Sequence, residues 1–398
     1  MFKHLFKMIW NRKRENALVL IELVTAFLVI FFIAAEAAHN WWLYRQPLGF
    51  EYQDTYEIRI GGLAGDWSEQ DGESLHQVLG AVRSHDLVEW AHVAHMGPFR
   101  NWQWTSDVTH DGRVVDSMFN QFTDGAPQDL GVELVEGRWF DETDAANPDR
   151  VVLINERLRA QLFGDENPIG VDIRNRSEHT ENPEIGYRVI GVFRDFRQRG
   201  ELAELRNYTI GRFPIEDKEQ RALTMLVKVQ PGLDAGIEED LQSLIQGIAR
   251  NWVVTVTSLE SLKRIQNREV ILPLTVAGLV AGFLLLMVAF GLFGVLWQNV
   301  TRRTDELGLR RAVGATRHRI YRQIVGEILV LALLAVAAGS LIGIQFPMLG
   351  TFSALNWQSA IEALLVGGAL ISALCLVCAL YPAWLASKRS PADALHYE

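Results

Sequence analysis

Few residues in the sequence have the types and spacing that metal binding or catalysis would need. His92 and His95 lie three apart in the segment HVAH, which would suggest a pair of metal ligands. The surrounding segment, VEWAHVAHM, is predicted to be a strand, and residues three apart on a strand point to opposite faces. We therefore interpret the two histidines as unrelated. Cys375 and Cys378 lie in a long apolar segment, where we interpret them as small packing residues.

Recognisable catalytic motifs are missing as well. The sequence contains no Gly-Lys dipeptide and therefore no P-loop for ATP, and neither the zinc-protease nor the serine-hydrolase signature occurs. We expect this chain to be no enzyme and to bind no cofactor or metal of its own.

Charged residues gather instead in RRTDELGLRRAVGATRHR, residues 302–319. Glu306 and Arg310 lie one turn apart in the order that stabilises a helix. Gly314 is predicted to end this helix, and Thr316 is predicted to cap the next one. The segment thus predicts a short helix that is jointed by an elbow to the helix that follows. Such a joint can pass motion to a membrane span, whereas the alternative is that the arginines only set membrane topology.

Long segments without charged residues lie on both sides of this stretch. A helix needs about twenty apolar residues to cross a bilayer, and buried helices of soluble proteins seldom have this many uncharged positions in a row. We therefore predict a membrane protein. The predicted spans are residues 17–38, 272–298, 325–346 and 361–386.

Two features inside these spans predict contacts between helices. Gly339 and Gly343 have the small-xxx-small spacing that lets helix backbones approach closely, so we expect this face to pack against another span, within the subunit or across a dimer. Glu22 is the one charged residue between Glu15 and Glu36. A carboxylate in a bilayer is costly, and we expect Glu22 to face protein rather than lipid.

Charge also predicts the orientation. Residues 1–16 and 298–323 are rich in Lys and Arg, whereas the long segment 38–268 is acidic. By the positive-inside rule, the two basic segments and the tail, 387–398, are cytoplasmic. Residues 39–268 and the loop 347–360 then lie outside, and residues 299–324 form the cytoplasmic connection. Residues 1–16 have an apolar stripe and predict a helix on the inner membrane surface, with partner binding as the alternative.

The external segment predicts an α+β domain in two lobes. Residues 50–100 and 221–265 each predict a β-α-β unit, and together they suggest a ferredoxin-like, porter-like lobe. Residues 101–220 predict an inserted second lobe with strands and a helix of its own. Within it, Trp102 and Trp104 would lie on one face of an extended segment, either in the core or in an exposed patch that contacts a partner.

The stretch RRTDELGLRRAVGATRHRI resembles the cytoplasmic motif of FtsX/MacB-type ABC transporter permeases. The ending YPAWLASKRSPADALHYE is similar to that family's final span and tail. GRWFDETD, VVLINERLRAQLFGDENPIG and YRVIGVFRDF look like the family's MacB-type periplasmic core domain. MacB itself carries its ATPase on the same chain, whereas this sequence shows none, and much of the insert matches nothing assignable.

The resemblance implies a permease subunit in the inner membrane of a bacterium, with both termini in the cytoplasm. It implies a separate ABC ATPase that holds ATP and Mg²⁺, and a dimer with a second copy or a homologous permease. An adaptor protein and an outer-membrane channel are further possible partners; no nucleic acid is expected. ATP hydrolysis would drive movement of the periplasmic domains, called mechanotransmission. The residues assigned to the ATPase contact and the elbow are Arg302, Arg303, Glu306, Leu307, Gly308, Leu309, Arg310, Arg311, Gly314 and Ala315.

The leading functional hypothesis is efflux or export of peptides, lipoproteins or amphiphiles. The alternative is a regulatory protein that activates a cell-wall hydrolase or senses an antimicrobial peptide, and these two hypotheses share every feature of the sequence. An external enzyme on a membrane anchor is disfavoured, because catalytic residues are missing and one span would be enough for an anchor.

Overall fold

The computed structural model divides into two compact units, which we describe separately. The helical unit comprises Met1–Trp42 and Ile271–Glu398, and the sheet unit comprises Leu43–Val270. The structure describes residues 13–61, 67–101, 104–146, 150–176, 185–218, 221–222, 224–232, 236–303, 306, 309–310, 312–350 and 355–388. The predicted helix at residues 1–16 lies largely outside these residues, as do most of the tail and Trp102.

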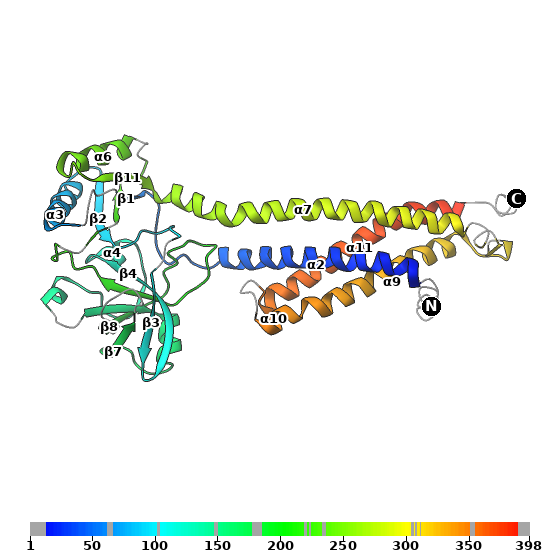
Figure 1. Cartoon of the computed structure of the whole chain (residues 1–398), viewed down its shortest axis with the longest axis horizontal. Coiled ribbons are helices and arrows are strands. Elements are labelled where there is room, and N and C mark those ends of the chain that lie inside the picture. The colour runs from blue at the N-terminus through cyan, green and yellow to red at the C-terminus, as the bar shows by residue number, and fades with distance from the viewer. Residues whose placement is uncertain are drawn as a thin grey trace. The chain divides into compact units, whose positions relative to one another are not determined.

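Among the described residues, the helical unit contains four long helices, which Figure 1 labels. They are α2 (Lys13–Tyr44), α7 (Leu259–Arg302), α9 (Arg317–Gly343) and α11 (Trp357–Lys388), and the short α10 (Gln345–Leu349) follows α9. Each long helix is long and apolar enough to cross a membrane, which confirms the prediction of four such helices among the described residues. At 44 residues, α7 is much longer than the roughly twenty that a bilayer requires. Its uncharged part begins at Val270.

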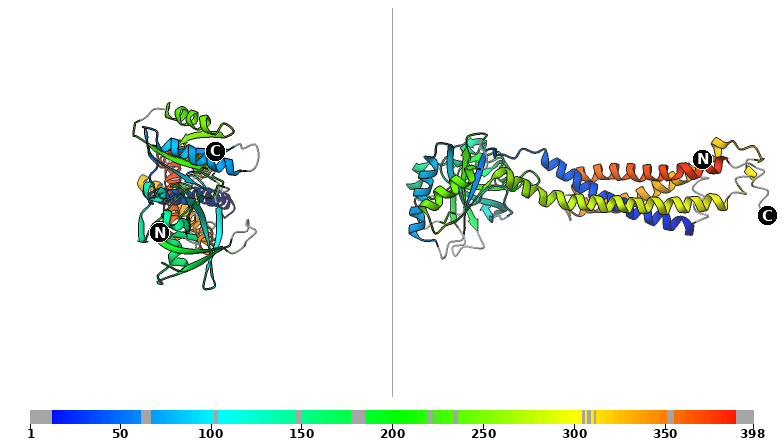
Figure 2. Two further views of the ribbon diagram at one scale, coloured as in Figure 1. Left: turned by 90° about the vertical axis from the view of Figure 1, so that its left-hand side faces the viewer. Right: turned by 90° about the horizontal axis from the view of Figure 1, so that it is seen from above.

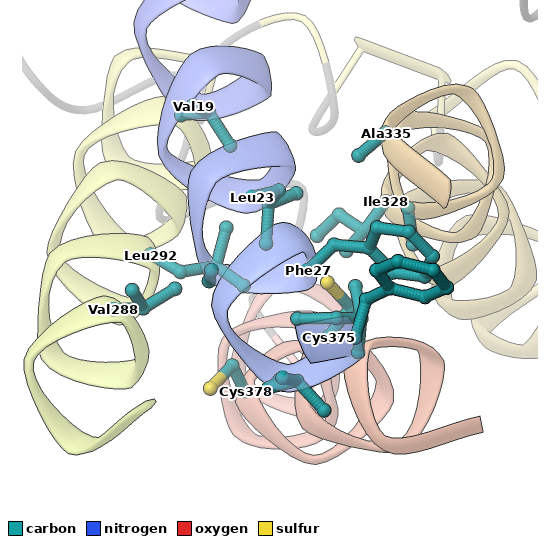
Figure 3. Packing of buried hydrophobic residues seen from close by; sticks show 14 of the residues in the cluster. Val19, Leu23, Phe27, Val288, Leu292, Ile328, Ala335, Cys375 and Cys378 are labelled. Carbon is teal, nitrogen blue, oxygen red and sulfur yellow. The ribbon is translucent and has the colours of Figure 1, made fainter. Parts of the chain in front are cut away.

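Helix α2 lies at the centre of this bundle, where Figure 3 shows its side chains between those of the other three long helices. Leu23, Phe27 and Phe31 on α2 are almost completely buried. The glycines of α9 make room for the aromatic rings: a Cβ atom added to Gly339 would lie 2.3 Å from Cδ1 of Phe27, and one added to Gly343 would lie 3.2 Å from Cε1 of Phe31. The small-xxx-small face therefore packs within the subunit.

Glu22 lies against helix α7. A Cβ atom added to Gly291 would lie 2.8 Å from its carboxylate oxygen Oε1, so the missing side chain of Gly291 leaves the space that the carboxylate occupies. The side chain of Glu22 is half-buried rather than fully exposed to lipid. As expected from the cost of placing a carboxylate in hydrocarbon, it turns toward a neighbouring helix.

In the sheet unit, two β-α-β segments far apart in the chain share one sheet. The strands β1 (Thr55–Gly61), β2 (Val88–Ala94), β10 (Thr224–Val229) and β11 (Val253–Ser258) pair antiparallel in the order β11-β1-β10-β2. The connecting helices α3 (Glu69–Arg83) and α6 (Gly236–Ile248) lie side by side (Figures 1 and 2) and share a core with these strands. Ser68 and Asp71 form a capping box that begins α3.

The described part of the segment between β2 and β10 adds seven strands to this sheet. They are β3 (Trp104–His110), β4 (Arg113–Phe122), β5 (Leu134–Gly137), β6 (Arg150–Asn155), β7 (Asp172–Arg176), β8 (Ile185–Phe193) and β9 (Tyr208–Arg212), accompanied by the helices α4 (Ala126–Asp129), η1 (Glu142–Ala146) and α5 (Glu156–Leu162). Trp104 is half-buried and packs against Phe119, which agrees with the first of its two predicted roles, packing in the core. The two parts of the sheet meet where Ala94 of β2 pairs with Phe122 of β4.

His92 lies beside this junction and links its two parts. Its Nε2 lies 2.7 Å from Oδ2 of Asp129, which ends α4, and its Nδ1 lies 3.4 Å from Oγ1 of Thr123. Burial lowers the pKa of His92, and the hydrogen bond with Asp129 only partly opposes this effect. His95, in contrast, lies beside the ring of Trp104. Within the part of the chain that the structure describes, no group of three or more His, Cys, Asp and Glu residues could hold a metal ion.

The lowered pKa of His92 predicts a pH dependence of stability. A histidine whose pKa is lower in the folded state favours folding at pH values above about 6.5, and this contribution is lost as the pH falls through the folded-state pKa. We expect the Tm of the full-length protein in detergent to fall between about pH 7.5 and about pH 5, and to fall less in His92→Gln. His76→Gln, which changes an exposed histidine of α3, should behave like the wild type. Equal falls in all three proteins would contradict this role of His92.

Candidate functional site

The elbow predicted by the arginine-rich stretch is visible as a defined helix end. The N–H of Val313 donates to the carbonyl of Leu309, and the N–H of Ala315 donates to that of Arg310, at 3.0 Å in both cases. Gly314 between them has a φ of +103°. A hydrogen bond between residues five apart, with a residue of positive φ just before its donor, is the Schellman motif that ends many helices. The space beside this glycine is open, since no atom lies within 4 Å of a Cβ placed on Gly314.

The next helix begins immediately after this turn. The Thr316 side chain accepts a hydrogen bond from the N–H of Arg319 and thereby caps α9, as the sequence predicted. Ala315 packs against a small core in which Ile320 and Ile324 of α9 meet Ala383 and Ala386 of α11. The elbow is therefore fixed by packing as well as by its caps, and a movement of the preceding segment would reach α9 directly.

A chain of polar contacts crosses the elbow. Arg310 binds the carboxylate of Glu306 at 2.6 Å and the side-chain oxygen of Gln323 at 2.9 Å. Gln323 in turn donates to Glu327 at 3.1 Å, and Glu327 binds Arg303 at 2.9 Å. Residues from before the elbow are thus connected to two residues on the first turns of α9.

The two ion pairs of this chain differ in burial. Arg303 and Glu327 are 19% and 15% exposed, whereas Arg310 and Glu306 are 35% and 51% exposed. An exposed pair contributes only about 0.2–1 kcal/mol, whereas loss of one partner from a buried pair costs about 3–5 kcal/mol. The Arg303–Glu327 pair therefore holds the end of α7 to α9, while the Glu306–Arg310 pair is available for contact with a partner.

A groove of about 790 Å³ opens beside the elbow. Its apolar lining includes Leu309 and Val313, which are exposed for 61% and 82% of their surface. The cationic side chains of Arg310, Arg319 and Arg322 line the same groove. Exposed apolar groups that are flanked by charges of one sign are typical of an interaction site. The complementary surface would be apolar with acidic residues at its margin.

The structure brings together most of the residues that the sequence assigned to this site. Arg303, Glu306 and Arg310 belong to the polar chain, Leu309 lines the groove, and Gly314 and Ala315 form the elbow, while Arg302 ends α7. Leu307, Gly308 and Arg311 lie outside the described residues.

Sequence reasoning missed Gln323 and Glu327. A signal was present, because the two residues are one helical turn apart and Glu327 is the last charged residue before a long uncharged segment.

Comparison with known proteins bears directly on this site. A model of the MacB-like periplasmic core domain matches residues 31–244, more than half of the chain, and a model of the FtsX-like permease C-terminal region matches residues 278–391. The chain is an ABC transporter permease of the FtsX/MacB type. The candidate site lies within the FtsX-like region of this permease.

Curated relatives of the permease are distant in sequence. It is 26% identical to the uncharacterized ABC transporter permease YknZ of Bacillus subtilis, over 71% of this chain and 70% of that protein. It is also 26% identical to the macrolide export ATP-binding/permease protein MacB of Bdellovibrio bacteriovorus, over 66% of this chain. The match covers only 41% of that MacB.

Solved structures also resemble the permease. The periplasmic region of MacB from Actinobacillus actinomycetemcomitans aligns with a TM-score of 0.38 and 14% identity, over 55% of this chain and 94% of that one. The extracellular domain of YknZ from Gram-positive bacteria aligns with a TM-score of 0.34 and 14% identity, over 50% of this chain and 99% of that one.

Proposed function

We propose that this permease is coupled to a separate ABC ATPase, which docks in the groove beside the elbow. The groove is the observation that carries the proposal: it combines exposed Leu309 and Val313 with several cationic side chains. ATP-driven movement of the ATPase would displace the segment before the elbow. The largely buried pair between Arg303 and Glu327 would then pass this displacement to α7 and α9.

Helix α7 would carry the movement onward, because it continues from Leu259, in the sheet unit, through Pro273 to Arg302. The basic segments predict that the elbow is cytoplasmic and that the sheet unit is outside. We infer that the permease lies in the inner membrane and acts as a dimer, with a second copy or a homologous permease. Mechanical work on the sheet unit would drive export of a peptide, lipoprotein or amphiphile. The name of the MacB relatives, macrolide export proteins, favours an amphiphilic cargo.

Purification in mild detergent tests the proposal directly. We expect an ABC ATPase to co-purify with the permease, and we expect its ATP hydrolysis in lipid nanodiscs to rise when the permease is present. Isolation of the permease with a hydrolase or a sensor kinase and without any ATPase would contradict the proposal and favour regulation.

Thiol labelling in intact cells tests the orientation. With Cys375 and Cys378 replaced by alanine, a cysteine in place of the exposed Glu142 should react with an impermeant reagent, and one in place of Val313 should not. Labelling of the second position would place the groove outside the cell, where no ATP-driven partner could reach it.

A further inference from the structure

A loop of the sheet unit contacts both segments by which the chain enters and leaves that unit. The loop follows β8, and its central residue is Arg197, which is only 4% exposed. The guanidinium of Arg197 donates to the carbonyls of Leu43 and Gln46 at 2.9 and 3.2 Å. Leu43 lies in the last turn of α2, where carbonyls lack partners within the helix and a cation is favourable. Arg197 thus fixes the chain where the sheet unit begins.

The same loop fixes the first turns of α7. Glu201 accepts a hydrogen bond from Lys263 at 2.8 Å, and both side chains are largely buried, at 11% and 19% exposed. Glu201 also accepts a hydrogen bond from Asn267, one turn further along α7, at 3.4 Å. Lys263 donates in addition to the hydroxyl of Tyr52 at 2.8 Å. These contacts precede Val270, where the sheet unit ends.

The loop is in turn held firmly by the rest of the sheet unit. Arg197 donates to two carbonyls of its own loop, those of Glu201 and Ala203, at 2.6 and 2.7 Å. Gln198 is buried; its backbone carbonyl accepts from the N–H of Phe99 at 2.6 Å, and its side chain accepts from the hydroxyl of Tyr208. Phe99 has a φ of +60°, a strained conformation for a residue with a Cβ atom.

We propose that residues 197–201 act as a clasp that holds the end of α2 and the start of α7 in fixed positions relative to each other. Movement of α7 would then change the conformation of the whole sheet unit. Arg197, Glu201 and Lys263 are the positioning residues. This inference rests on the proposed function, because it names the part of the sheet unit that receives the movement. Buried ion pairs add little net stability over apolar packing, but they specify geometry because breaking one leaves an unpaired charge.

Charge reversal within the clasp tests the coupling without any ATPase. The hydrogen bonds of Lys263 go to Glu201 and Tyr52, whereas residues 43–46 are held by Arg197. In nanodiscs, we expect Lys263→Glu and Glu201→Lys each to speed amide exchange at residues 43–46 by about tenfold or more, and the double reversal to restore most of the protection. Asp172→Lys, which breaks the exposed pair with Arg188, is the control and should leave these amides unchanged. Unchanged exchange at residues 43–46 in both single reversals would overturn the clasp.

A second measurement separates the clasp from the docking of the ATPase. In the complex, the single reversals should keep stimulated ATP hydrolysis within about twofold of the wild type, a small change next to the roughly tenfold loss expected for a broken coupling contact. In the wild-type complex, we expect ATP to change the amide exchange of β3 and β4. The single reversals should lose this change, and the double reversal should regain it. Retention of this change in both single reversals overturns the clasp alone. Failure of the wild type to bind or stimulate an ATPase overturns the proposed function, while the exchange at residues 43–46 still decides whether the clasp exists.

Discussion

Replacing Gly314 with valine is expected to reduce the stimulation of ATP hydrolysis by the permease by about tenfold or more and to leave membrane insertion intact. The φ of +103° at this position is open to glycine, whereas a β-branched residue would be strained by about 1–2 kcal/mol or more. Because no atom lies within 4 Å of the added Cβ, the strain acts on the backbone alone. It would open the Schellman turn and shift Leu309 and Val313 relative to α9.

Gly350→Val is the matched control for this prediction. Gly350 also has a positive φ, of +60°, and also has open space around its Cβ position, but it follows α10 at the other end of α9. We expect Gly350→Val to insert and to stimulate ATP hydrolysis nearly as well as the wild type, with Gly314→Val reduced by tenfold or more, equivalent to about 1.4 kcal/mol. Normal stimulation by Gly314→Val in nanodiscs would show that the elbow plays no part in coupling.

Replacing Gly339 with leucine should strongly destabilise the helical unit. The first added atom would lie 2.3 Å from the fully buried ring of Phe27, so α2 or α9 must move. Overpacking of this kind costs about 1–3 kcal/mol or more, which exceeds the helix propensity of about 1 kcal/mol gained when glycine is removed. We expect a Tm several degrees below that of the wild type in detergent, measured by the loss of the monodisperse peak after heating.

Two variants distinguish packing from a general effect of leucine in a span. A Cβ atom added to Gly278, on α7, meets no atom within 4 Å, so Gly278→Leu should be neutral or slightly stabilising. Adding Phe27→Ala to Gly339→Leu frees the space beside the new side chain and should recover part of the lost stability. If Gly339→Leu unfolds at the wild-type temperature, the contact between α2 and α9 is not as close as described.

Much of this fold could be predicted from the sequence because its signals are local. The spans follow from long uncharged segments, and the β-α-β units follow from apolar strands beside amphipathic helices. The hairpin of β3 and β4 was not predicted, although Asp111 and Gly112 between its strands are a strong hairpin signal and both have positive φ. The pairing of β4 with β9, more than eighty residues away, has no local signal at all.

In the candidate site, too, local features could be predicted from the sequence and contacts between distant residues could not. The helix end at Gly314 and the cap at Thr316 depend on residues within five positions of each other, and both were predicted from the sequence. The pair between Arg303 and Glu327 joins residues on opposite sides of the elbow, so it depends on how tightly the chain turns. The groove depends on the same turn, because its lining comes from both sides of Gly314.

Photo-cross-linking from the groove tests the central claim most directly. A photoreactive amino acid in place of Val313, which is 82% exposed, should form a cross-link to an ABC ATPase in cells. The same amino acid in place of Leu349, which is 75% exposed at the other end of α9 and α10, should form none. We predict that the Val313 cross-link weakens in Glu306→Lys, because this change breaks the pair that orients Arg310 and places a like charge one turn from it. An ATPase that co-purifies with the permease but never cross-links from position 313 would contradict docking at the elbow.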